Sequence, residues 1–526
     1  MIKIAKYWFI IGLFFTVLCT EIKGEQIIDA PFDNPQDDIL QSEITLPGQN
    51  NTIFQILNQV SRQTGYYFIY DSQIIDNDQR VRIRRGTFTI EGLLEVVLDD
   101  PSLEYRVIDK YIIIRKPPEI PADEITGDES TPEADEKITI FGKVMDAGSG
   151  TTLPFATIAL LNKASGVTTN RDGVFNLRLP AVMIDDTLRI SYVGYKARSI
   201  PVALLVEGTH DIYLQPDLIS LQEVIITYYN PYEILRNALE AKTKLYTDKP
   251  AHHTSFYREG VLKGEKVISY SEAVFRVHKT AYHQQAEDQV LLLKSRNISN
   301  LELDDTLILK LKAGVRSALE LDVMKTLPEF LQEEYLSEFE LKGADIVAFD
   351  GGAVFAIEFE EAAHILDPRY RGTIFIDRES LAILQVDFEI HPSYLRKNER
   401  RFIPKRSPDH VTRIQSMRYA VQYRNHGGTY HLNHVRGDVE IRIRQKNRLF
   451  GQNYNVFFEM AVVDIDTLRT DRFRRRELLN TRSIFSDQDF EYDQDFWKDF
   501  ITIYPEKRIS DALREMNIEI ESLIQE

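Results

Sequence analysis

Apolar residues in the first part of the chain, residues 42–116, follow two spacings. A helical spacing occurs first between Asn51, which can cap a helix, and Gly65, which can end it, and again after a capping Thr89. The apolar positions are Ile53, Ile56, Leu57 and Val60, and then Ile90, Leu93, Leu94, Val97 and Leu98. Around these helices, EITLP, YYFIYD, VRIRR and LEYRVIDKYIIIRK alternate as short strands do. The pattern predicts a small α/β module.

The second helix and the strands after it carry a family resemblance. The stretch GTFTIEGLLEVVLDDPSLEYRVIDKYIII, from Gly86, resembles the short N-terminal (STN) domain shared by secretins and TonB-dependent transducers. In that family the domain is a periplasmic module that binds proteins and is not a catalyst. The resemblance therefore implies a docking function and no catalytic residue.

Residues 137–216 have strand patterns at short intervals and no helical spacing. ITIFGKVMD, FATIALL, GVFNLRL, TLRISYVGY and HDIYLQP alternate, and AGSGT and NRDG have turn composition, which predicts a β-sandwich. The segments FGKVMDAGSGTTLPFATIALL, GVTTNRDGVFNL and LRISYVGYKA resemble the carboxypeptidase regulatory-like domain, a transthyretin-like sandwich. Asn170 and Asp172 suggest a calcium loop, but too few carboxylates converge there, so a hairpin turn is the favoured interpretation.

After a connector at 217–229, residues 230–526 combine helical and strand patterns. LQEVIIT, from Leu221, is similar to a string in TonB-dependent receptors, but about 300 residues remain, too few for a plug and a 22-strand barrel. Asn230 and Pro231 instead begin a helix, and alternating segments with Gly-containing turns predict a long antiparallel meander. A C-terminal helix is expected to carry Ile509, Ala512, Leu513, Met516, Ile520 and Leu523. This part is predicted to be an antiparallel α+β domain.

Three motifs in this last part have counterparts elsewhere. FYREG, YRGTIFID and DFWKDFITIYPEKRISDAL resemble the C-terminal region of Gram-negative envelope proteins that carry the regulatory-like sandwich and have no assigned activity. The meander with its G-x-I-x-I-D strand is also similar to the half-barrel of lipoprotein carriers. The fold class expected for the whole chain is therefore multidomain, with α+β and all-β parts.

Composition, charge and the N-terminal segment limit the kind of protein this can be and its cellular location. The chain is 43% hydrophobic and 27% charged, as globular proteins are, and its net charge of -18 opposes nucleic-acid binding. Lys3 and Lys6 before the apolar run from Tyr7 to Cys19 predict a signal peptide at 1–24, with an uncleaved anchor or a lipoprotein as alternatives. We expect a periplasmic protein, with outer-membrane association left open.

The segment 117–136 differs from everything around it. It contains prolines and eight acidic residues but no basic ones. Such a sequence predicts a stiff, extended linker that lets the first module move semi-independently. An acidic docking peptide is the alternative.

The motifs of a peptidase are missing. No histidine begins H-x-x-E; the nearest approaches are His364 with Asp367 and the pair His278 and His283. Neither G-x-S-x-G nor S-x-x-K occurs. We therefore predict no catalytic, cofactor-binding or metal-binding residue and no cofactor.

Three further groups of residues are candidate sites. His426, His431 and His434 could bind zinc, but strand alternation places 431 and 434 on opposite faces. Tyr257, Arg258 and Glu259 could form an acid–base site, but Tyr257 and Glu259 share a face, and cross-strand pairing explains them better. The basic stretches RKNERRFIPKR, from Arg396, and FRRR, beside Arg472, could meet lipid headgroups and are expected to be solvated loops.

These observations predict a non-enzymatic envelope protein with two competing functions. In the first it is an interaction or signalling scaffold whose STN-like module docks an envelope protein, a TonB-linked receptor or an anti-sigma type regulator being candidates. In the second it is a carrier that holds lipid or another apolar ligand in the C-terminal sheet. An enzyme of unrecognised class ranks third, and the oligomeric state is not predicted.

Overall fold

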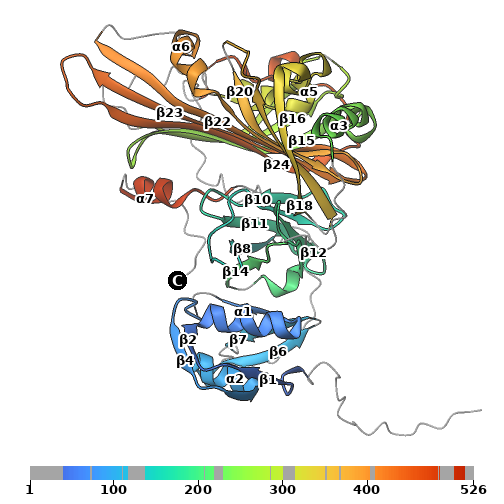
Figure 1. The fold of residues 1–526 in the computed structure, drawn as a ribbon, viewed down its shortest axis with the longest axis vertical. Helices are drawn as coiled ribbons and strands as arrows, with labels where there is room; N and C mark the ends of the chain where they lie inside the picture. Colours follow the sequence, from blue (N-terminus) through green and yellow to red (C-terminus); the bar gives the residue numbers. More distant parts are fainter. Residues whose placement is uncertain are drawn as a thin grey trace, which may run out of the picture.

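The computed structural model describes most of the chain in three stacked parts (Figure 1). The described residues are 39–71, 74–108, 110–116, 137–206, 208–217, 229–284, 286–299, 314–349, 352–366, 369–402, 409–483, 485 and 503–515. The predicted signal peptide, the acidic linker and most of the connector at 217–229 lie outside these residues. Within them the fold is mostly β, with some helices and one large sheet.

The N-terminal module packs two helices on short strands around its own core. Its elements are β1 (Glu43–Leu46), β2 (Gln49–Thr52), α1 (Ile53–Thr64), β3 (Tyr67–Tyr70), β4 (Arg80–Ile83), β5 (Gly86–Thr89), α2 (Ile90–Leu98), β6 (Glu104–Ile108) and β7 (Tyr111–Arg115). The apolar positions predicted to face the sheet are buried, except the partly buried Leu98. Gly65 ends α1 with φ 76°, and Thr89 caps α2 as expected, but Thr52, and not Asn51, caps α1. Thr52 is the better cap because two hydrogen bonds form a capping box: Gln55 N donates to the Thr52 side chain, and Thr52 N donates to the Gln55 side chain.

The second part is a sandwich of two sheets. Its elements are β8 (Lys137–Asp146), β9 (Thr157–Leu160), β10 (Gly166–Thr168), β11 (Val174–Pro180), η2 (Ala181–Met183), β12 (Thr187–Ser191), β13 (Arg198–Pro201), η3 (Val202–Leu204) and β14 (Thr209–Leu214). One sheet has the order β10-β9-β12-β13 and the other β11-β8-β14, in which β14 runs parallel to β8. Alternating residues of both sheets fill the space between them.

The C-terminal part is built on a ten-stranded antiparallel sheet, counted over the described residues. Its strands are β15 (Ala251–Lys263), β16 (Lys266–Lys279), β17 (Gln289–Ser299), β18 (Phe339–Phe349), β19 (Gly352–Glu361), β20 (Tyr370–Asp377), β21 (Ile383–Ile390), β22 (His410–His426), β23 (Thr429–Gln445) and β24 (Gln452–Asp466). Its helices and 3-10 turns are α3 (Pro231–Leu245), α4 (Val315–Glu320), α5 (Val323–Thr326), η6 (Glu329–Leu331), η7 (Glu333–Glu338), α6 (Pro392–Phe402), η8 (Arg475–Glu477) and α7 (Lys507–Glu515).

The strand order departs from a simple meander. It is β17-β16-β15-β24-β23-β22-β21-β20-β19-β18, so the chain builds three strands at one side, resumes at the far edge with β18, and winds back until β24 joins β15. The segment predicted as a further pairing partner, β24, is therefore central. Of the predicted C-terminal helix, α7 includes the buried Ile509, whereas Met516, Ile520 and Leu523 lie outside the described residues.

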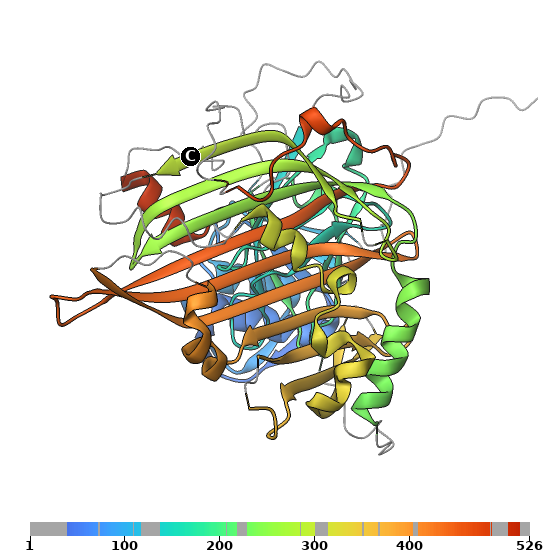
Figure 2. The ribbon, with the colours of Figure 1, turned by 90° about the horizontal axis from the view of Figure 1, so that it is seen from above.

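The two faces of the large sheet have different covers. One face is covered by α3, α4, α5, η6 and η7. Figure 2 shows the yellow helices lying over the strands and the green α3 along one side of the sheet, and a large apolar cluster fills the space beneath them. The other face rests on the sandwich, and Phe256, Val274, Ala461 and Val463 of the sheet join the sandwich core. The sheet therefore separates two buried regions, and each contains a group of charged side chains.

Candidate functional site

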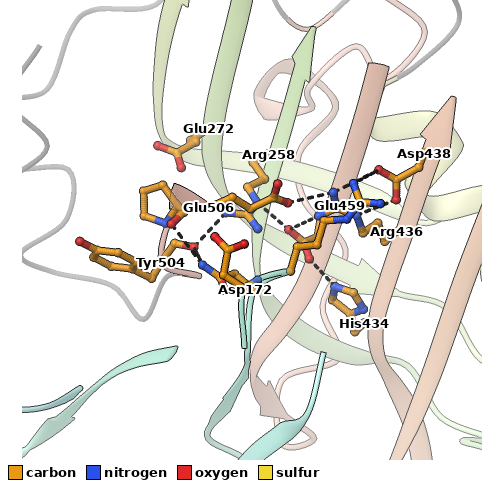
Figure 3. Close-up of polar contacts among 12 residues, drawn as sticks. Asp172, Arg258, Glu272, His434, Arg436, Asp438, Glu459, Tyr504 and Glu506 are labelled. Atoms are coloured by element: carbon orange, nitrogen blue, oxygen red, sulfur yellow. Dashed lines mark hydrogen bonds and ion pairs between the residues drawn. The ribbon is translucent and has the colours of Figure 1, made fainter. Parts of the chain in front are cut away.

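The face of the sheet that rests on the sandwich carries a row of buried charges (Figure 3). Arg296, Glu272, Arg258, Glu459 and Arg436 occupy directly opposed positions on β17, β16, β15, β24 and β23. Positive and negative side chains alternate along this row, and none is more than 4% exposed. We call these five residues the charge ladder.

Direct contacts join Arg296 to Glu272, and Glu459 to both Arg258 and Arg436. Arg258 Nε donates to Glu459 Oε2, Arg296 Nε donates to Glu272 Oε2 at 2.6 Å, and Arg436 Nη1 lies 3.5 Å from Glu459 Oε2. Burial alone would raise the pKa of Glu459, but the two arginines and a hydrogen bond with His434 hold that pKa well below its ordinary value. The carboxylate therefore stays ionised, and every described charge in the row has an opposite neighbour.

Contacts made by Phe155 connect the ladder to the sandwich. Phe155, in the loop before β9, has φ 63° and stacks on His434 with ring centroids 5.1 Å apart. The Arg436 guanidinium lies 5.3 Å from the centre of the same ring. A bulky residue at positive φ is strained, and such strain persists only where the surroundings hold it. The contacts with His434 and Arg436 therefore hold the loop before β9 in place against the sheet.

The segment around residues 503–507 fills the rest of the junction. Arg436 Nη2 lies 2.9 Å from Glu506 Oε1, and Arg258 Nη1 donates to Tyr504 O at 3.1 Å. From the sandwich, Asn170 Nδ2 donates to the carbonyl oxygens of Tyr504 and Pro505, and Asp172 Oδ2 accepts from Lys507 N at the start of α7. Three parts of the chain thus meet at one joint, in which oppositely charged side chains lie next to one another.

This arrangement decides the role of two groups noted in the sequence. Asn170 and Asp172 form a hairpin turn, in which Asn170 Oδ1 accepts from Val174 N, and the turn clamps the C-terminal segment. Tyr257 Oη donates to Glu259 Oε2 at 2.6 Å on one face of β15, while Arg258 joins the ladder on the other. The predicted cross-strand pairing therefore holds for Arg258, which bonds Glu459 on β24, whereas Tyr257 and Glu259 contact each other along the same strand.

The three histidines of NHGGTYHLNH do not lie as strand alternation predicts. The register shifts between Gln422, which pairs with His434, and Tyr423, which pairs with Leu432, so a β-bulge interrupts the alternation and the argument from opposite faces was wrong. His434 bonds Glu459, whereas His431 packs against the rings of His253 and His426. In the described part of the chain, no group of three metal-ligating side chains is suited to hold an ion.

A second group of charges lies on the helix-covered side of the sheet. Lys279 Nζ lies 2.7 Å from Asp288 Oδ2 and also contacts Asp322 Oδ2, while Lys325 Nζ contacts Asp288 Oδ1. Tyr423 Oη donates to Asp322 Oδ1 at 2.7 Å. We call Lys279, Asp288, Asp322 and Lys325 the lysine–aspartate cluster.

Unlike the ladder, this cluster borders a pocket. The pocket has a volume of about 530 Å³, and its lining includes Lys242, Tyr282, Asp288 and Lys325. Burial, reinforced by Lys279, lowers the pKa of Lys325, and burial also lowers that of Lys242. A perturbed lysine in a cleft is a candidate site, but the Lys325 ammonium is already bonded to Asp288 and Thr280. Lys325 and Asp288 therefore form an ion pair at the wall of the pocket.

The remaining sequence candidates lie apart from both groups. His278 packs on His252 and Phe473, His283 lines the pocket and is exposed, and Asp367, the partner considered for the exposed His364, lies outside the described residues. The basic stretch from Arg396 was expected to be a loop, but its described part belongs to α6, which is anchored by Tyr394 and Leu395 against Ile414. Arg472 is exposed, and the ring of the neighbouring Phe473 packs on His252.

Comparison with protein families supports the sandwich prediction. Residues 140–226 match the model of the CarboxypepD_reg-like domain. The match begins within β8, includes β9 to β14, and extends beyond the predicted boundary at 216. This domain type is regulatory and non-catalytic, and no enzyme family is indicated for the chain. No curated protein matches it.

Solved structures give only distant likenesses. A DUF1329 family protein from Desulfovibrio piger is 9% identical, with 44% of this chain and 94% of that chain covered and a TM-score of 0.18. Lipovitellin is 6% identical, with 44% and 26% covered and a TM-score of 0.20. Similarity this low carries no argument about function. Among the described residues, no helix has the length and apolar character needed to cross a membrane.

Proposed function

We propose that this protein is an exported, non-enzymatic scaffold of the bacterial cell envelope. In this proposal the STN-like module docks a periplasmic or outer-membrane protein, and the sandwich and the large sheet hold the module at a fixed distance. The observation that carries the proposal is the closed joint built from the charge ladder, the sandwich turn and the segment around Glu506. Among the described residues, the charged side chains of the ladder are buried and contact other parts of the chain.

The joint between module and sandwich supports the same interpretation. Phe54 stacks on Tyr213 with centroids 3.9 Å apart, and Asn77 Nδ2 donates to Asp211 Oδ2 at 2.7 Å. The Arg198 guanidinium lies 4.7 Å from the centre of the Tyr67 ring. The semi-independent module expected from the linker is therefore replaced by one that packs directly on the sandwich. A force or displacement applied to the module would reach the sandwich through these contacts.

The module retains a surface for a partner. Within the described chain, β6 (Glu104–Ile108) hydrogen-bonds only to β7, so its outer edge is open. An extended segment of another protein can add to such an edge, with backbone hydrogen bonds giving affinity. A TonB-linked receptor or an anti-sigma type regulator is the kind of partner we propose.

The carrier alternative has less support. It requires an apolar space on one face of the large sheet, but Phe330, Phe339, Leu331 and Met324, all at most 2% exposed, fill the helix-covered face. The pocket beside the lysine–aspartate cluster is lined by Leu319 and Leu327 but also by Lys242, Asp288, Arg316 and Lys325, and a lipid chain would have to desolvate these charged groups.

The scaffold proposal is tested with residues 42–116, which have a core of their own. This fragment should unfold cooperatively and capture the same envelope protein as the full chain, whereas the full chain without residues 42–116 should not. Leu94→Ala, at a fully buried position, should cost about 2 to 5 kcal/mol and abolish capture. If the module captures nothing and residues 230–526 purify with bound lipid seen by mass spectrometry, the carrier replaces the scaffold.

A further inference from the structure

The hairpin between β23 and β24 ends in two exposed apolar side chains. Leu449 is 89% exposed and Phe450 is 81% exposed, although each is large and they are adjacent. β23 has 17 residues and β24 has 15, and their hairpin projects beyond neighbouring strands (Figure 2). At these exposures, the described part of the sheet leaves both side chains largely uncovered. Their exposure needs an external explanation.

Basic residues surround this tip. Arg442, Arg444, Lys446 and Arg448 lie within the seven residues before Leu449, and no acidic residue occurs between Arg442 and Asn453. Arg444 Nη1 donates to Arg448 O, which holds the turn. The chain as a whole carries a net charge of -18, so this local positive patch is set against the general charge of the protein. Asp409 lies beside the start of this tip, since its carbonyl oxygen accepts from Lys446 N.

The base of the hairpin is stiffened by a small core of its own. Val261, Ile268, Ile441, Tyr454 and Val456 form an apolar cluster separate from the two large ones. The turn between β15 and β16 is bonded to the same strands, since Gly264 N donates to Asn453 O. The tip is therefore presented by a braced element.

We propose that this hairpin tip, residues 442–450, docks on the surface of an anionic lipid bilayer. Leu449 and Phe450 would enter the interfacial layer, and the four basic side chains would contact lipid phosphates. The charge pattern selects this occupant over an apolar groove of a protein, because the positive charges flank two apolar residues at a convex point. The proposal goes beyond the scaffold function, since the module that docks a partner lies at the opposite end of the molecule (Figure 1).

The experiment measures binding of the full chain to vesicles of phosphatidylcholine alone and of phosphatidylcholine mixed equally with phosphatidylglycerol. We expect binding to the anionic vesicles only. The triple change Arg444→Gln, Lys446→Gln and Arg448→Gln should weaken it about a hundredfold, since each basic residue near an anionic surface contributes about fivefold. Leu449→Ser with Phe450→Ser should weaken it about tenfold or more. All variants keep the same N-terminus, so any contribution of residues 1–24 cancels.

Matched controls separate the tip from general charge and exposure. Arg82→Gln, Arg84→Gln and Arg85→Gln remove three exposed charges from the N-terminal module, and Leu468→Ser removes an isolated leucine that is 93% exposed. Both controls should bind like the wild type. In Phe450→Trp, brominated lipid should quench fluorescence added by the new tryptophan. Failure to bind anionic vesicles, equal binding to neutral ones, or tip variants that bind like the controls would each overturn the proposal.

Discussion

The charge ladder and the lysine–aspartate cluster lie on opposite sides of one sheet and solve the same problem differently. In the ladder, strand register alone places Arg258, Glu459 and Arg436 side by side, and the sandwich closes over them. In the cluster, Asp288 and Asp322 come from loops, and the group borders a pocket of about 530 Å³. Buried charges are tolerated in both because each is paired. The two groups should differ when one charged partner is removed. Solvent in the pocket can hydrate the charge left unpaired in the lysine–aspartate cluster, whereas the ladder borders no such pocket among the described residues.

The largest effect should follow from breaking the ladder at its centre. Glu459→Gln removes the carboxylate shared by Arg258 and Arg436 and leaves two buried guanidinium groups without it. We expect the free energy of unfolding to fall by about 3 to 5 kcal/mol in urea denaturation. Glu440→Gln is the control, because its ion pair with Arg418 is solvent-exposed and should contribute at most about 1 kcal/mol. Equal losses in the two variants would contradict a special role for the buried row.

A smaller loss is expected on the other side of the sheet. Asp322→Asn weakens the hold on Lys279 and Tyr423, but Lys279 keeps Asp288, and the asparagine oxygen can still accept a hydrogen bond. The loss of stability should be about 1 to 3 kcal/mol. A loss as large as that of Glu459→Gln would show that the nearby pocket gives no relief, and the comparison between the two groups would fail.

Much of the fold was predictable, because its patterns are local. The caps of α2 and α3, the Gly264 turn and the sandwich strands follow from residues close together in the sequence. The shared face of Tyr257 and Glu259 also followed from strand alternation. The ladder did not, because Arg258 and Glu459 are 201 residues apart and meet only when β24 returns beside β15. A charged residue inside an apolar strand, as in FYREG and FFEMA, was the available signal.

The errors have equally specific causes. A single bulge in β23 removed the alternation on which the argument about His431 and His434 depended. The Arg396 stretch is highly charged, so its helix was missed; the helix exists because the residues before it, Tyr394 and Leu395, pack on Ile414. Tertiary contacts decided both cases and left no local pattern.

A carboxylate without a cation should behave in the opposite way to Glu459 as pH changes. Burial raises the pKa of Asp387 from 3.8 to about 6, and its one described bond is from Gln385. The folded state therefore binds this proton more tightly, so stability is lost as pH rises from about 4 to 6. For Glu459, whose pKa is lowered, stability is present above its ordinary pKa of 4.5 and lost on acidification.

Asp387→Asn should accordingly raise the free energy of unfolding by about 1 to 2 kcal/mol at pH 8 and change it little at pH 3, as measured by urea denaturation at both values. Asp377→Asn, at the end of the neighbouring strand β20, serves as a control for the substitution itself, because the asparagine oxygen can still accept the hydrogen bond from Ser380. A gain at pH 3 equal to that at pH 8 would rule out titration of Asp387 as the cause.

The smallest effect on stability should come from the edge of the joint, where the contact between Asp172 and Lys507 is exposed to solvent. Asp172 accepts from Lys507 N, so its carboxylate faces the positive end of α7. Asp172→Asn keeps an acceptor but removes the charge, and we expect a loss of about 0.5 to 1 kcal/mol in global stability. The local effect should be clearer, because backbone amides of residues 507–515 should exchange hydrogen faster while those of β24 do not. Asp186→Asn, which breaks an exposed ion pair with Lys163 elsewhere on the sandwich, should leave exchange in α7 unchanged. Faster exchange in β24 as well would mean that the C-terminal segment and the ladder open together, and that the joint is one cooperative unit from its centre to its edge.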